Sequence, residues 1–81
     1  MAILNITYGG RSADLGSPVD DRVSDGDVVR IAVEVVRGGD LGGLHVRDLA
    51  PDAFRHFVVD RLHGPGGVLR IYLRPKVPFG C

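Results

Sequence analysis

The sequence predicts a small α+β domain, and three segments carry that prediction. The first, Ile3 to Tyr8, and the last, Val68 to Arg74, alternate apolar and polar residues as half-buried strands do. Between them, residues 24–37 have the capping residues and apolar spacing of a helix that buries one face. With 81 residues we expect one domain with a modest core, which suits a binding module, carrier or modifier better than an enzyme.

The N-terminal segment predicts a β-hairpin. Leu4, Ile6 and Tyr8 share one face of the first strand. Gly9-Gly10 can adopt the positive φ angles of a tight hairpin turn, and residues 11–15 form a short return strand. Gly16-Ser17-Pro18 then ends the hairpin.

A helix is predicted next, with Ser24 as its N-cap and Asp25 and Asp27 in its first turn, where the helix dipole favours negative charge. Gly38-Gly39 supplies the C-terminal stop. The alternative is a strand from Val28 to Val36, since β-branched residues lose χ1 freedom in a helix. We favour the helix because caps, charges and spacing agree. Its apolar face would consist of Val28, Ile31, Ala32, Val35 and Val36.

The second half of the chain is less regular. Leu44 to Arg47 could form a short strand, and residues 49–52 indicate a turn. Within residues 54–62 the apolar spacing fits a helix, but Phe57-Val58-Val59 favours a strand, which we predict. Residues 63–67 then form a turn.

The last strand is the clearest, with Leu69, Ile71 and Leu73 on one face and Arg70, Tyr72 and Arg74 on the other. Pro75 and Pro78 are expected to prevent ladder pairing after it. The sequence therefore predicts a folded domain over residues 1–74 and an extended tail over residues 75–81.

Composition argues against several classes of function. A net charge of zero gives no electrostatic footprint for nucleic acid or an anionic membrane, and no apolar run approaches the ~18 residues of a membrane span. The N-terminus lacks the basic region of a signal peptide, so cytoplasm is the expected location. Cys81 is the only cysteine, which leaves no intrachain disulfide. His45, His56 and His63 lack the spacing of metal ligands, so we expect neither a metal nor a cofactor of the chain's own.

The order of elements, and the residues at both ends, resemble the β-grasp fold of ubiquitin and of the sulfur carriers of thiamine and molybdopterin synthesis. Met1 to Ile6 resembles the first strand of ubiquitin, and Leu69 to Arg74 resembles the aliphatic/basic alternation of its last strand. The tail, Ile71 to Gly80, is more similar to those of bacterial ubiquitin-like proteins encoded beside activating-enzyme, conjugating-enzyme and deubiquitinase homologues. The resemblance implies a mixed sheet of four to five strands packed on one main helix, with a flexible C-terminal tail.

The resemblance also implies a protein modifier. An activating enzyme would use ATP to adenylate the Gly80 carboxylate and would pass the acyl group to a nucleophile. Glycine suits this position because its backbone can enter a narrow channel. A deubiquitinase-like peptidase would first remove Cys81, which otherwise holds the terminal carboxylate. A conjugating enzyme and a target protein are the further partners. The residues that would contact the activating enzyme are Arg74, Val77, Pro78 and Phe79.

The tail departs from the family because a single glycine, Gly80, follows the bulky Phe79 where ubiquitin has two glycines. One alternative function is a sulfur carrier with a thiocarboxylate at Gly80, although Phe79 and Cys81 argue against it. Another is a non-conjugated adaptor that binds by adding an edge strand. Lys76 is the only lysine, so it and the N-terminal amine are the only amines that could accept a second copy.

Overall fold

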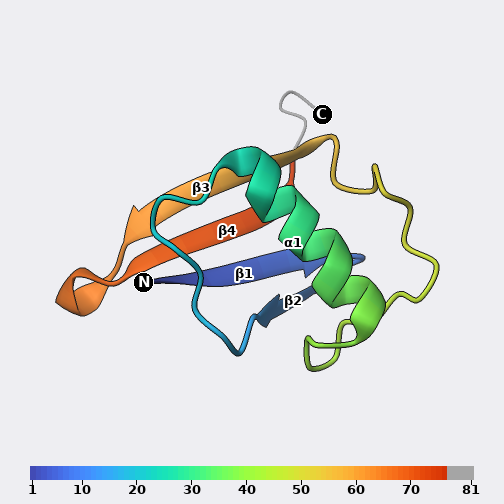
Figure 1. Cartoon of the computed structure of the whole chain (residues 1–81), viewed down its shortest axis with the longest axis horizontal. Coiled ribbons are helices and arrows are strands. Elements are labelled where there is room, and N and C mark those ends of the chain that lie inside the picture. Colours follow the sequence, from blue (N-terminus) through green and yellow to red (C-terminus); the bar gives the residue numbers. More distant parts are fainter. Residues whose placement is uncertain (77–81) are drawn as a thin grey trace.

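The computed structural model describes residues 1–76 as an α+β fold with four strands, one α-helix and one short 3-10 helix (Figure 1). The predictions for residues 77–81 lie outside the described residues. The elements are β1 (Ala2–Tyr8), β2 (Arg11–Asp14), α1 (Asp25–Gly38), β3 (Phe57–His63), η1 (Pro65–Gly67) and β4 (Leu69–Pro75).

The strands form one mixed sheet in the order β2-β1-β4-β3, and α1 crosses one face of it (Figure 1). β1 pairs antiparallel with β2 and parallel with β4, and β4 pairs antiparallel with β3. Because β1 and β4 are parallel, both run towards the same end of the sheet. We call this the exit end, because β4 finishes there at Pro75, next to Tyr8 and Phe57. The opposite end of the sheet, at Ala2, His63 and Leu69, is called the far end.

The alternation predicted for the two outermost segments of the sequence is confirmed. Leu4 and Ile6 of β1 are fully buried, as are Ile71 and Leu73 of β4. The two strands lie side by side in the middle of the sheet, so their apolar faces form the floor of the core beneath α1 (Figure 1). The hairpin turn is also confirmed: Gly9 and Gly10 have φ angles of 59° and 80°.

The predicted helix is confirmed over the alternative strand. Ser24 caps it, because its hydroxyl accepts the Asp27 N–H at 3.1 Å, and Gly39 ends it in the left-handed conformation with φ 76°. The buried stripe is rotated from the predicted one, because Val33 is buried whereas Ile31 and Val35 are partly exposed. The buried helix residues are Val28, Ala32, Val33 and Val36.

The short strand predicted over Leu44 to Arg47 is wrong. This segment forms only an isolated bridge between Leu41 and Leu44, and Val46 N–H donates to the Val36 carbonyl oxygen of α1 at 3.1 Å. The physical reason is that Leu41 and Leu44 are both buried, so the segment turns back to close the core and does not join the sheet. Residues 40–56 thereby cross the exit end, on the right of Figure 1.

Two strand boundaries also differ from the predictions. The strand predicted within residues 54–62 begins only at Phe57, because residues 51–56 form successive turns. β4 continues through Pro75, which lies opposite Phe57, although the sequence placed Pro75 in an unpaired tail. This position lies beyond the last β1–β4 pair, Ile6 with Leu73, so β4 has a neighbour on one side only and tolerates a proline there.

Within residues 1–76, no helix combines the length and the apolarity that crossing a membrane requires.

Candidate functional site

Three aromatic rings meet at the exit end, where β4 finishes. Phe54 lies edge-on to Tyr8 with ring centroids 5.5 Å apart, and edge-on to Phe57 at 4.9 Å. Tyr8 and Phe57 stack at 6.1 Å. Both arrangements are favourable for aromatic pairs. Phe57 is the residue opposite Pro75, so the last position of β4 lies beside a packed aromatic cluster.

Arg74 is the one predicted contact residue for an activating enzyme that the structure describes. It lies on the outer face of the sheet, away from α1, where its guanidinium pairs with the Asp60 carboxylate of β3. The side chains are 51% and 39% exposed, so water competes for both charges. A partner can therefore take Arg74 from Asp60 at low cost.

The structure does not test the arrangement of the other predicted site residues. Val77, Pro78, Phe79, Gly80 and Cys81 lie outside the described residues. Lys76 follows Pro75 and is exposed.

The outer face of the sheet also carries a polar network that the sequence did not predict. Arg70 donates to the Tyr72 hydroxyl at 2.9 Å and pairs with Asp14 at 3.3 Å. Asn5 donates to Asp14 at 2.8 Å and accepts from the Ser12 hydroxyl at 2.9 Å. The hydrogen bond to Tyr72 raises the pKa of Arg70. These contacts join β2, β1 and β4 and balance the charges there, which indicates a structural role.

The three histidines lie in different parts of the described structure and do not share a hydrogen bond. The Nε2–H of His45 donates to the Arg37 carbonyl oxygen at 3.1 Å, because a carbonyl can only accept. His56 accepts from its neighbour Arg55, and His63 ends β3. Within the described part of the chain, no cluster of three or more His, Cys, Asp or Glu side chains could hold a metal ion.

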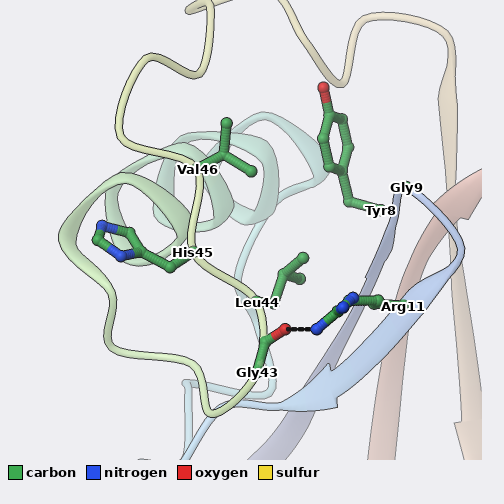
Figure 2. A pocket seen from close by; sticks show the side chains of 7 residues that line it. All are labelled: Tyr8, Gly9, Arg11, Gly43, Leu44, His45 and Val46. Carbon is green, nitrogen blue, oxygen red and sulfur yellow. Dashed lines mark hydrogen bonds between the residues drawn. The ribbon is translucent and has the colours of Figure 1, made fainter.

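A cavity of about 390 Å³ opens between the β1–β2 hairpin and the loop that follows α1 (Figure 2). We call it the Arg11 pocket. Arg11 spans its edge and donates to the Gly43 carbonyl oxygen at 3.2 Å. The pocket is lined by Tyr8, Gly9, Arg11, Gly43, Leu44, His45 and Val46, none of which is acidic.

Sequence reasoning missed this pocket because its two walls are far apart in the chain. The Arg11–Gly43 hydrogen bond joins residues 32 positions apart, and no local spacing signals such a contact. Arg11 has no carboxylate partner among residues 1–76. Five other arginines are ion-paired there: Arg30, Arg55, Arg61, Arg70 and Arg74.

Comparison with protein-family models, with curated proteins and with solved structures finds no match to this chain. A functional assignment therefore rests on the residues and the fold described above.

Proposed function

We propose that this chain is a ubiquitin-like protein modifier that is joined to a target protein through Gly80. The observation that carries the proposal is the position of β4. It lies between β1 and β3, and its last residue, Pro75, is paired beside the aromatic cluster. Only residues 76–79 separate this fixed point from Gly80. A short segment after a strand that is paired on both sides suits a C-terminal tail that an enzyme must bind in its active site.

The topology supports a ubiquitin-like β-grasp assignment within this proposal. A mixed sheet in the order β2-β1-β4-β3, with a parallel central pair and one helix across a face, is compatible with that fold. The two ends of the sequence that resemble ubiquitin, Met1 to Ile6 and Leu69 to Arg74, are the segments that form this central pair.

The proposed chemistry is performed on the chain by partners. A deubiquitinase-like peptidase hydrolyses the Gly80–Cys81 peptide bond and frees the Gly80 carboxylate. The activating enzyme joins that carboxylate to AMP from ATP and releases pyrophosphate, and its nucleophile then displaces AMP. A conjugating enzyme transfers the acyl group to the target. The activating enzyme would contact the exposed Arg74 and three residues of the tail, Val77, Pro78 and Phe79. Because the proposed reaction uses ATP, the cytoplasm is its expected location.

An epitope tag at the N-terminus allows a direct test in the cells that encode the chain. The tagged protein should give a ladder of larger covalent species on a denaturing gel, and Gly80→Ala should abolish it. Deletion of Cys81 is the matched control, because it exposes the same glycine without processing and should retain the ladder. Urea unfolding of the purified variants checks that both changes leave the domain folded.

A ladder that survives Gly80→Ala would overturn the proposal. If no variant forms covalent species, the mass of the purified chain separates the alternatives. A sulfur carrier would gain a thiocarboxylate at Gly80, whereas an adaptor would keep an unmodified C-terminus and bind its partner equally well as Gly80→Ala.

A further inference from the structure

We propose that the Arg11 pocket binds a carboxylate side chain, glutamate or aspartate, of a partner protein. The pocket lies outside the tail, so this proposal stands whether or not Gly80 is conjugated. Three properties carry it: fixed walls, an unmatched positive charge, and apolar surface beside that charge.

Both walls of the pocket are fixed by the fold. On one side, Tyr8 and Arg11 are paired residues of the β1–β2 hairpin. On the other, Leu44 is anchored in the core with 4% of its surface exposed. Hydrogen bonds from Val46 N–H and from the His45 ring fasten the same loop to the end of α1. A ligand therefore meets a pocket that is already shaped, which reduces the entropy lost on binding.

The charge in the pocket favours an anion. Arg11 donates one N–H to the Gly43 carbonyl oxygen, and this hydrogen bond holds the guanidinium at the rim of the pocket. The other N–H groups of the guanidinium remain as donors for a ligand. No acidic residue lines the pocket, and within residues 1–76 no carboxylate pairs with Arg11. A guanidinium binds a carboxylate through two parallel hydrogen bonds, which are stronger than bonds between neutral groups.

The remaining surface favours a side chain of a protein over a phosphate. The ring of Tyr8, with Leu44 and Val46, places apolar surface next to Arg11, while the His45 ring lies towards α1 (Figure 2). A phosphate carries a charge of about −1.5 to −2 at neutral pH, whereas one guanidinium matches the single charge of a carboxylate. The pocket thus fits an acidic residue that has an apolar neighbour.

The pocket lies at the exit end of the sheet. Tyr8 belongs both to the pocket lining and to the aromatic cluster beside Pro75. A partner that places an acidic side chain here would lie close to the point where β4 ends.

Titration of the ¹⁵N-labelled full chain with two capped dipeptides tests the proposal. The probe is acetyl-Leu-Glu-amide, and the neutral control acetyl-Leu-Gln-amide has the same shape. The acidic peptide should shift the Gly9 and Gly43 amide signals to saturation, with a dissociation constant on the order of 1 mM for a single charged contact. Arg11→Gln should weaken binding about tenfold, since a charged hydrogen bond is lost.

Two further arms complete the experiment. Arg22→Gln is the matched control, because Arg22 is another exposed arginine outside the pocket, and it should bind the acidic peptide unchanged. If Arg11→Gln does not fold, the comparison of the two peptides on the wild-type chain decides whether the charge of the ligand is required. Equal shifts with both peptides, undiminished binding by a folded Arg11→Gln, or tighter binding of inorganic phosphate would each overturn the proposal.

Discussion

The two ends of the sheet are built differently. At the exit end, three aromatic rings pack together, residues 40–56 cross the open edge of the core, and Arg74 pairs with Asp60 on the outer face. At the far end, the short segment 64–68 connects β3 to β4, and large apolar side chains face water. These are Met1 (84% exposed), Leu62 (59%) and Val68 (40%).

This difference follows from the parallel pairing of β1 and β4, which sends both central strands towards one end. The exit end must be closed by side chains from elsewhere, and Phe54 and Leu44 of the long loop supply them. The far end is closed by the η1 turn and by the loop between β2 and α1, in which Val19 forms a bridge with Ala2. The exit end thus offers a partner a fixed surface beside the last residue of β4, while the far end leaves Met1, Leu62 and Val68 exposed to water.

The largest loss of stability is expected from the substitution Phe54→Ala at the exit end. The side chain is 1% exposed and contacts both other rings of the cluster, so truncation should lower the free energy of unfolding by about 3–5 kcal/mol. Urea denaturation followed by circular dichroism measures this change. If the variant is unfolded in the absence of urea, Phe54→Leu provides a milder truncation on the same scale.

The matched control at the far end is Val68→Ala, which removes apolar surface that is already exposed. We expect a change within about 0.5 kcal/mol. Equal losses at Phe54 and Val68 would contradict the difference between the two ends.

A small effect on stability is also expected for the Arg74–Asp60 pair. A double-mutant cycle with Arg74→Ala and Asp60→Ala should give a coupling energy of about 0.2–1 kcal/mol, because both side chains are exposed. Conjugation should respond unequally: Arg74→Ala should reduce the ladder of conjugates, whereas Asp60→Ala, which releases Arg74, should not. Equal ladders for both variants would remove Arg74 from the contact surface proposed for the activating enzyme.

The regular elements could be predicted because their signals are local. Alternation identified β1 and β4, and Ser24 and Gly39 marked both ends of α1. Within the helix, the spacing did not distinguish Val33 from Val35, because the final rotation depends on how α1 packs on the sheet.

The loop and the candidate sites could not be predicted in the same way. Leu44 has the character of a strand residue, but burial against Leu41 and the rest of the core decided its place. The Arg11 pocket depends on a contact between the hairpin and residues 43–46, and the Arg74–Asp60 pair on the register of two strands. The sequence predicted Arg74 as a contact residue from the family resemblance, and it gave no sign of Asp60 as its partner.

The most direct test of the central claim is the covalent remnant that trypsin leaves on a target. Trypsin cleaves after Lys76 but not between Arg74 and Pro75, so a conjugated copy should leave residues 77–80, Val-Pro-Phe-Gly, on the target side chain. Mass spectrometry of purified conjugates should find this remnant ending at Gly80, with no cysteine. Recovery of only the free peptide of residues 77–81, with Cys81 attached in every preparation, would contradict the account.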